Sequence, residues 1–192
     1  MLSHKGTIEI NTDRLLLRKF KLQDADDMFN NWGNDKEVTK FLSWKPHKTI
    51  EVTREFIDTC INEYKKINTY HWAIELKEIG QVIGSIGLVE LDNENYSCEI
   101  GYCISRKYWS KGMMTESLHA VIDYLFSEIG LNRIVAKHDT NNIASGKVMI
   151  KSGMKCEGTL REVKVRNDKE FYNLAVYSIL KSEWLIEREV LR

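Results

Sequence analysis

The sequence predicts an α+β fold with a mixed, mostly antiparallel sheet flanked by helices, and two observations support that class. Strand-like segments of period two are joined by short polar turns between residues 71 and 104, which is typical of antiparallel pairs. A strand–helix–strand passage around residues 115–129 implies locally parallel strands. At 192 residues the chain is long enough for one well-cored domain and short for two. We therefore expect a single domain over residues 1–192.

The first third of the chain is expected to hold one strand, two helices and a loop. Residues 15–20 are strand-like, although their leucine content alone leaves a helix open. Residues 24–32 read as a helix, and residues 34–48 as a loop. A second helix is predicted over residues 49–66, because apolar side chains recur there at helical spacing and Thr49 is suited to cap it.

The rest of the chain is expected to contain further strands and two helices. Gly130 and Gly153 stand where a helix would end in a left-handed residue. Strands are predicted at 71–76, 81–91, 96–104 and 133–138, helices at 115–129 and 144–152, and a final hairpin at 154–165 and 170–180 with its turn at 166–169.

Composition limits the classes of function. Lys+Arg and Asp+Glu are equal at 28 each, so no global field favours nucleic acid. No apolar run approaches the roughly 20 residues that span a bilayer. Residues 1–6 lack the apolar core of a signal peptide. The sequence therefore predicts a cytoplasmic protein with neither a nucleic-acid nor a membrane partner.

The four cysteines do not form a recognisable site. They are Cys60, Cys98, Cys103 and Cys156, without a CxxC pair or a histidine at ligand spacing. A disulfide framework and a metal site are therefore not expected. Small buried hydrophobic side chains are the preferred interpretation.

A glycine-containing turn at residues 108–116 connects a strand-like run to a helix-like run. Backbone N–H groups at such a helix N-terminus, together with the helix dipole, suit a phosphate or pyrophosphate. The turn is neither a Walker A motif nor a dinucleotide fingerprint, because the required glycines are absent. Taken alone, one glycine also fits an ordinary strand-to-helix connection.

Further motifs occur on both sides of this turn in a fixed order. They are Glu99-Ile100-Gly101-Tyr102-Cys103-Ile104, Leu131-Asn132-Arg133-Ile134, Asn142-Ile143-Ala144-Ser145, Lys151-Ser152-Gly153-Met154 and Glu157-Gly158. With them, the chain resembles the GNAT superfamily of acyl-CoA-dependent N-acyltransferases. More narrowly it resembles the RimJ/RimL type, which acetylates the N-termini of ribosomal proteins. The segments 12–18 and 177–180 fit the same branch, so the resemblance covers about residues 7–184.

The resemblance implies a sheet whose central strands splay apart, with acetyl-CoA as co-substrate in the gap. Its turn pattern is Gln/Arg-x-x-Gly-x-Gly/Ala. Trp109 takes the first place and Gly112 the fourth, whereas Met114 replaces the final small residue and must point its side chain away. The implied cofactor-binding residues are Tyr102, Cys103 and Ile104 beside the pantetheine arm, Trp109, Ser110, Lys111, Gly112, Met113, Met114 and Thr115 at the pyrophosphate, and Asn142 with Ser145. Lys111 is equally compatible with a solvated lysine.

Two glutamates are candidates for the general base that deprotonates the amine. Glu99 is the first candidate, acting directly or through water, and an exposed strand glutamate is its alternative interpretation. Glu162 is the second. In one RimJ/RimL-type pattern a glutamate aligns with Lys164 here, which is a departure from the family.

For the thiolate leaving group, many GNAT members use a tyrosine where this chain has Met149. The RimJ/RimL type instead resembles Asn142-x-x-Ser145, which makes Ser145 the proton donor or thiolate stabiliser. Asn142 would bind the cofactor, or cap the helix that follows, or both. A thiolate with a pKa near that of cysteine, about 8.5, also leaves without an acid.

The resemblance favours a protein N-terminal α-amine as acceptor, with Phe41 and Trp44 as substrate contacts. A small amine such as a polyamine, an amino acid or an antibiotic is the alternative within the same activity. A non-catalytic acyl-CoA-binding module is the alternative from another class. Dimers occur in this branch, which leaves a homodimer open.

Overall fold

The computed structural model describes residues 1–165 and 169–190. Contacts within the chain define two compact units. The N-terminal unit combines residues 4–87 with 102–120, and the C-terminal unit combines residues 1–3, 88–101 and 121–192. Strands β4 (Gln81–Asp92) and β5 (Ser97–Ile104) and helix α4 (Met113–Tyr124) each pass from one unit into the other.

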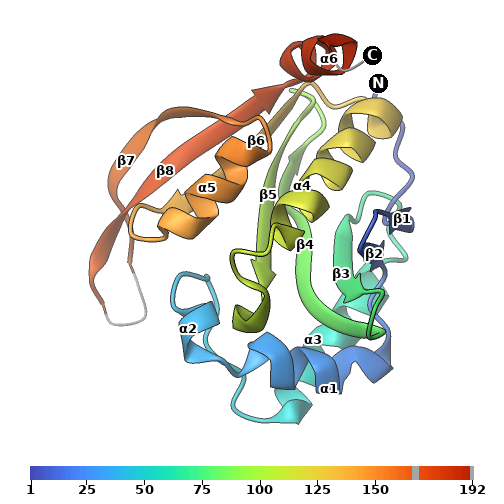
Figure 1. The fold of residues 1–192 in the computed structure, drawn as a ribbon, viewed down its shortest axis with the longest axis vertical. Helices are drawn as coiled ribbons and strands as arrows, with labels where there is room; N and C mark the ends of the chain where they lie inside the picture. The colour runs from blue at the N-terminus through green and yellow to red at the C-terminus, as the bar shows by residue number, and fades with distance from the viewer. Residues whose placement is uncertain (166–168, 191–192) are drawn as a thin grey trace. The chain divides into compact units, whose positions relative to one another are not determined.

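The N-terminal unit contains an antiparallel sheet. Strands β1 (Ile10–Asn11), β2 (Leu15–Arg18) and β3 (His71–Leu76) pair in this order, and β3 pairs with the first part of β4 (Figure 1). Leu15 and Leu17 of β2 are completely buried, which anchors this strand in the core. The short β1 was not predicted from the sequence, because two residues carry no detectable period.

Helices of the N-terminal unit cover a core that includes Phe20, Met28, Trp32 and Ile57. The helix predicted at 24–32 consists of three successive short segments, η1 (Leu22–Asp24), α1 (Ala25–Met28) and η2 (Phe29–Gly33). The predicted loop contains a short helix, α2 (Lys36–Thr39). The long helix α3 (Ile50–Glu63) begins after Thr49 as predicted, but the Thr49 side chain makes no capping hydrogen bond.

The C-terminal unit contains both parallel and antiparallel pairings. Strand β6 (Arg133–Asp139) pairs with β5 in parallel and with β8 (Phe171–Leu180) antiparallel, and β7 (Lys155–Val165) is the edge strand beside β8. The hydrogen-bonded order of all eight strands is β1-β2-β3-β4-β5-β6-β8-β7. This confirms the mixed, mostly antiparallel sheet. Of the predicted hairpin turn, residues 166–168 lie outside the described residues.

The parallel pairing of β5 with β6 is short. It joins Ser97–Ile100 to Arg133–Ala136 and ends there, although β6 continues to Asp139. The last three residues of β6 pair only with β8. The pairing thus ends before either strand does, in agreement with splayed central strands.

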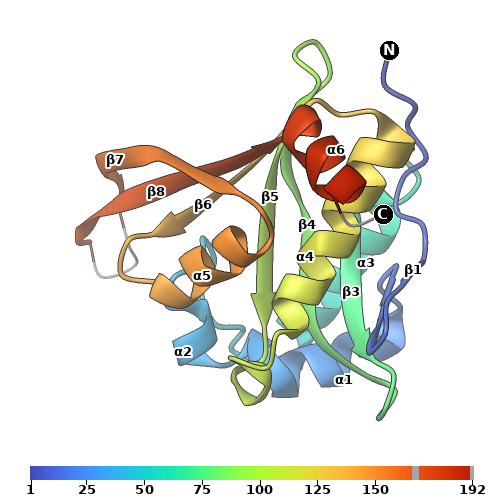
Figure 2. The same cartoon turned by 45° about the horizontal axis from the view of Figure 1, so that its top comes forward.

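Helices complete the C-terminal unit. Helix α5 (Ile143–Lys151) packs along β6 and β7, as Figure 2 shows. Segment η4 (Leu125–Ile129) extends α4 to the left-handed Gly130. Helix α6 (Lys181–Val190) was not predicted, and it is held by Trp184, whose ring lies 5.5 Å from that of Phe126. Across the described residues, no helix has the length and apolarity to cross a membrane.

Candidate active site

The connection from β5 to α4 has an unusual backbone conformation. It passes through η3 (Arg106–Tyr108) and then through two left-handed residues, Ser110 with φ 60° and Gly112 with φ 77°, on either side of Lys111. Glycine adopts this conformation freely, whereas it costs a serine about 1 kcal/mol. Contacts from the surrounding structure must therefore hold the turn in this shape.

The turn exposes a row of free hydrogen-bond donors. None of the six N–H groups from Ser110 to Thr115 has an acceptor within the part of the chain that the structure describes. The first bond of α4 runs from the Glu116 N–H to the Gly112 carbonyl. Successive free N–H groups at the positive end of a helix suit an anion. The turn therefore fits the pyrophosphate of a nucleotide-bearing cofactor.

A segment before β2 is bonded to this turn. The Arg14 side chain donates from Nε to Glu116 Oε2 at 2.7 Å and from Nη1 to the Lys111 carbonyl at 2.9 Å. The Thr12 hydroxyl donates to Glu116 Oε1 at 2.6 Å. Burial raises the pKa of Glu116, but the hydrogen bonds from Thr12 and Arg14 outweigh it, so the pKa lies below its ordinary value. We call Thr12, Arg14 and Glu116 the clasp.

The turn is exposed at Ser110, Lys111 and Gly112. Met113 and Met114 are both buried, so the side chain that departs from the family pattern points into the core. Trp109 is half-exposed and its indole N–H donates to the Ile104 carbonyl at 2.9 Å. The ammonium groups of Lys107 and Lys111 lie 5.5 and 5.4 Å from the centre of the Tyr108 ring. Positive charge thus lies beside the free donors.

The end of β5, Tyr102–Ile104, lies against β4. A Cβ added to Gly84 would stand 2.5 Å from the Cys103 carbonyl oxygen, so only glycine allows this approach. Burial raises the pKa of the Cys103 thiol. Since the thiolate is the reactive form, Cys103 is not suited to be a nucleophile.

Glu99 lies in the first half of β5, in the C-terminal unit. Its Oε2 accepts a hydrogen bond from Lys137 Nζ at 2.5 Å, and both side chains are partly exposed. Lys137 lies on the neighbouring strand β6, one residue beyond Ala136, which is the last residue that pairs with β5. This partner was not predicted from the sequence, because strand spacing does not reveal which residues of two distant strands come together.

The N-terminus of α5 has the geometry of a capped helix. The Asn142 side chain accepts a hydrogen bond from the Ser145 N–H at 3.3 Å, and the Asp139 side chain accepts one from the Asn141 N–H at 2.9 Å. The interpretation of Asn142 as the N-cap is therefore confirmed. Met149 is almost completely buried, on the same helix.

Glu162 lies on the edge strand β7. The pairing register with β8 shifts between Leu160 and Lys164, and Glu162 sits inside this irregularity with a φ of 49°. Its N–H donates to Asn173 Oδ1 at 2.8 Å, and its side chain is exposed. Lys164 is paired with Tyr172 across the hairpin.

Phe41 and Trp44 lie in the segment after α2, in the N-terminal unit, and both are half-buried. Trp44 packs against the core cluster and its ring lies 5.1 Å from that of His47. Lys40 Nζ stands 5.4 Å from the centre of the Phe41 ring. Both aromatics thus combine a packing role with a remaining exposed surface.

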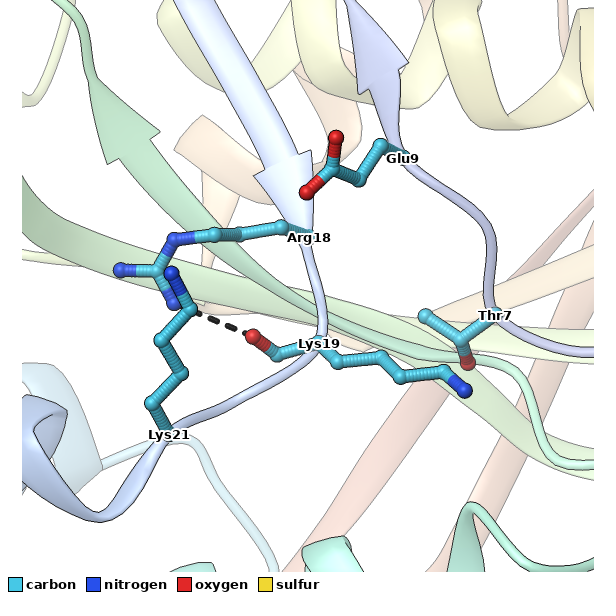
Figure 3. Close-up of a pocket in the computed structure, with 5 residues that line it drawn as sticks. All are labelled: Thr7, Glu9, Arg18, Lys19 and Lys21. Atoms are coloured by element: carbon cyan, nitrogen blue, oxygen red, sulfur yellow. Dashed lines mark hydrogen bonds between the residues drawn. The ribbon is translucent and has the colours of Figure 1, made fainter.

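A separate pocket of about 200 Å³ lies in the N-terminal unit (Figure 3). It is lined by Thr7, Glu9, Arg18, Lys19 and Lys21. The Arg18 guanidinium, which faces it, is already bonded to Asp24 at 2.8 Å and to Glu75 at 2.6 Å. The charge of this buried cation is therefore neutralised by its two carboxylate partners.

One cysteine–histidine contact occurs in the core. Cys60 Sγ lies 3.4 Å from His71 Nδ1. Burial raises the pKa of Cys60 to about 12 and lowers that of His71 to about 4, so both groups are neutral and form no thiolate–imidazolium pair. Within residues 1–165 and 169–190, no group of three His, Cys, Asp or Glu side chains is arranged to hold a metal ion.

Comparison with known proteins identifies relatives over most of the chain. A family model described as an acetyltransferase (GNAT) domain matches residues 14–155. The uncharacterized N-acetyltransferase YoaA of Bacillus subtilis is 36% identical over 172 residues, which is 90% of this chain and 96% of YoaA. The [Ribosomal protein uS5]-alanine N-acetyltransferase of Escherichia coli is 22% identical over 166 residues, with 83% and 84% of the two chains covered.

Solved structures show the same fold. A GNAT-family acetyltransferase from Bacillus anthracis superposes with a TM-score of 0.80 at 28% identity, covering 91% of this chain and 99% of that one. The microcin C7 self-immunity acetyltransferase MccE, solved with acetyl-CoA and AMP, gives a TM-score of 0.78 at 21% identity, covering 88% and 93%. The predicted fold is therefore confirmed.

Proposed function

As a member of the GNAT family of acetyltransferases this chain is an enzyme, and we propose that it transfers the acetyl group of acetyl-CoA directly to a primary amine. The observation that carries the proposal is the row of six free N–H groups from Ser110 to Thr115. These donors would bind the pyrophosphate, with Lys111 adding charge. Tyr102, Cys103 and Ile104 would lie beside the pantetheine arm. We propose that one catalytic domain comprises residues 1–192 and acts in the cytoplasm.

Acetyl-CoA supplies an activated thioester, and the chain must handle two protons. In the proposed reaction the neutral amine attacks the thioester carbon, the C–N bond forms and the C–S bond breaks. Glu99 accepts the proton that the amine loses, directly or through water. Its contact with Lys137 orients the carboxylate on the strand. Glu162 is the weaker candidate, because it lies exposed in the irregularity of β7.

Ser145 is the proposed donor to the departing thiolate, with Asn142 as a further cofactor contact. Support comes from the RimJ/RimL-type pattern Asn-x-x-Ser. In the structure the Asn142 side chain already bonds the Ser145 N–H, which fixes the first turn that carries the Ser145 hydroxyl. The capping and the catalytic roles are compatible.

The favoured acceptor is the α-amine of a protein N-terminus, with Phe41 and Trp44 as contacts. An α-amine has a pKa of about 7.7–8.0 and is partly neutral at physiological pH, whereas a lysine amine at about 10.4 needs a stronger base. The E. coli relative named for uS5 alanine supports this choice, at 22% identity. A small amine is the second candidate within the same activity.

Thermal unfolding with acetyl-CoA tests the cofactor site. At a hundred times its dissociation constant the ligand adds about 2.7 kcal/mol of stability, a Tm increase of about 5–10 °C for a chain of this size. We expect this increase in the wild type and its loss in Gly112→Glu, in which a carboxylate stands beside the pyrophosphate.

The matched control is Gly80→Glu, because Gly80 has a similar positive φ but lies in the β3–β4 turn, where an added Cβ meets nothing within 4 Å. This variant should keep the full Tm increase. No increase in the wild type at saturating acetyl-CoA contradicts the proposal.

A further inference from the structure

We propose that Arg14 is a positioning residue that holds the phosphate-binding turn in the shape required for its ligand, an inference that rests on the proposed function of that turn. The segment 12–14 was noted in the sequence only as part of the family resemblance. In the structure it supplies every polar contact that the described residues show to the Glu116 carboxylate.

The contact at the Lys111 carbonyl sets the direction of a donor. A trans peptide is planar, so the C=O of Lys111 and the N–H of Gly112 point in opposite directions. Arg14 Nη1 binds that carbonyl at 2.9 Å. The Gly112 N–H is therefore directed away from Arg14, on the side that is free for a ligand. Arg14 thus fixes the peptide between the two left-handed residues of the turn.

The backbone of Arg14 is held in place by the sheet. Arg14 immediately precedes β2, whose first residue, Leu15, is completely buried and paired with Leu76. The Arg14 carbonyl also accepts a hydrogen bond from the Lys77 N–H at 3.1 Å. A guanidinium on so fixed a backbone loses little additional freedom when it bonds the turn.

The Arg14 guanidinium bonds two partners, the Glu116 carboxylate and the Lys111 carbonyl. The Glu116 carboxylate accepts from Nε and from Nη2 at 2.7 Å, which leaves Nη1 aimed at Lys111. A lysine at position 14 has one ammonium and cannot reproduce the three contacts of the planar fork. Arg14→Lys therefore keeps the charge and loses the geometry.

The test measures the Kd of acetyl-CoA and of S-acetylpantetheine, which lacks all phosphates, by calorimetry and displacement. We expect Arg14→Lys to weaken acetyl-CoA about tenfold and to leave S-acetylpantetheine unchanged, with a Tm close to wild type. A merely structural loss would weaken both ligands together. Arg188→Lys is the matched control, because Arg188 is a similarly exposed arginine paired with Asp123 at 2.9 Å, and it should change neither ligand.

A double variant separates geometry from charge. If Arg14 only neutralised Glu116, adding Glu116→Gln would restore acetyl-CoA binding to Arg14→Ala, which lacks the charge, and that rescue overturns the inference. Unchanged acetyl-CoA affinity in Arg14→Lys overturns it too, while wild-type binding upholds the proposed cofactor site. Failure of the wild type to bind acetyl-CoA overturns both. If Arg14→Lys does not fold, Glu116→Gln alone is expected to weaken acetyl-CoA and not S-acetylpantetheine, and equal affinity for acetyl-CoA overturns the inference.

Discussion

Helices α4 and α5 both begin shortly after a strand, yet their N-termini are satisfied in opposite ways. At α5 the Asn142 side chain accepts from the Ser145 N–H in the first turn, and the Asp139 side chain accepts from the Asn141 N–H just before the helix. At α4 the residue in the same position is Gly112, which has no side chain, and the six N–H groups around it are free within the described chain. A side-chain cap satisfies part of a helix end without a ligand, whereas an uncapped end is stabilised when an anion arrives.

The N-termini of α4 and α5 also differ in which residues hold their backbone in place. The α5 cap is local, since Asn142 and Ser145 are three residues apart. The α4 turn is braced from about a hundred residues away in the sequence, by Thr12 and Arg14. Arg14 bonds a carbonyl oxygen of the turn, which holds its backbone without using the N–H groups. The local cap of α5, by contrast, accepts a hydrogen bond from an N–H of the first turn.

The largest expected effect is on amide hydrogen exchange. Free amides exchange rapidly, and a bound pyrophosphate would accept hydrogen bonds from several of them. We expect saturating acetyl-CoA to slow exchange at Ser110–Thr115 by tenfold or more, with a much smaller change at the Ser145 amide, which already has an acceptor. Equal slowing at both helix ends would remove the distinction between them. Free CoA serves as the control, because it carries the same pyrophosphate.

An intermediate effect is expected from removing the α5 cap. Asn142→Ala should lower the free energy of unfolding by about 1 kcal/mol, because the Ser145 N–H loses its side-chain acceptor and keeps only the Asn142 backbone carbonyl at 3.1 Å. Urea denaturation measures the change. Asn142→Asp retains the acceptor and should stay within about 0.5 kcal/mol of the wild type. A stable Asn142→Ala would show that the cap is not what holds this end.

The smallest effect is the pH dependence of the clasp. The pKa of Glu116 is lowered in the folded state, so the stability it contributes is present above the ordinary pKa of 4.5 and is lost as the pH falls through the folded value. The exposed Arg14 partner limits this contribution to about 0.2–1 kcal/mol. We expect urea midpoints of wild type and Glu116→Gln to differ at pH 7 and to converge as the pH falls below the lowered pKa of Glu116 in the folded state. A constant difference across this range would contradict the assignment.

Much of the architecture follows from sequence periodicity. The strands at 71–76, 81–91 and 96–104, the long helix after Thr49 and the α4–η4 helix were all predicted to within a few residues. Short or broken elements were not. The region 24–32 divides into three kinds of helical turn, and α6 depends on Trp184 packing against a residue far away in the sequence. Period alone carries no information about such tertiary contacts.

In the candidate site, too, some features were predicted from the sequence and others were not. Gly112 and the helix that follows predicted a phosphate-binding turn, because glycine before an apolar helix has a direct physical meaning. The departure at Met114 was correctly expected to turn its side chain away. Partnerships across the sheet, such as Glu99 with Lys137 and Arg14 with Glu116, were not predicted, because they depend on strand register. The roles of Ser145 and Glu162 in the reaction stay predictions.

Strand β7 has a further consequence for how the protein behaves at high concentration. Eleven residues long and exposed along its length, it carries Leu160, Val163 and Val165 on an open sheet edge. A straight edge of this kind would recruit a strand from another molecule and seed aggregation. The two register shifts of β7, one of them around Glu162, bend this edge and disrupt its ladder of hydrogen bonds. The irregularity around Glu162 thus also opposes strand pairing between copies of this chain.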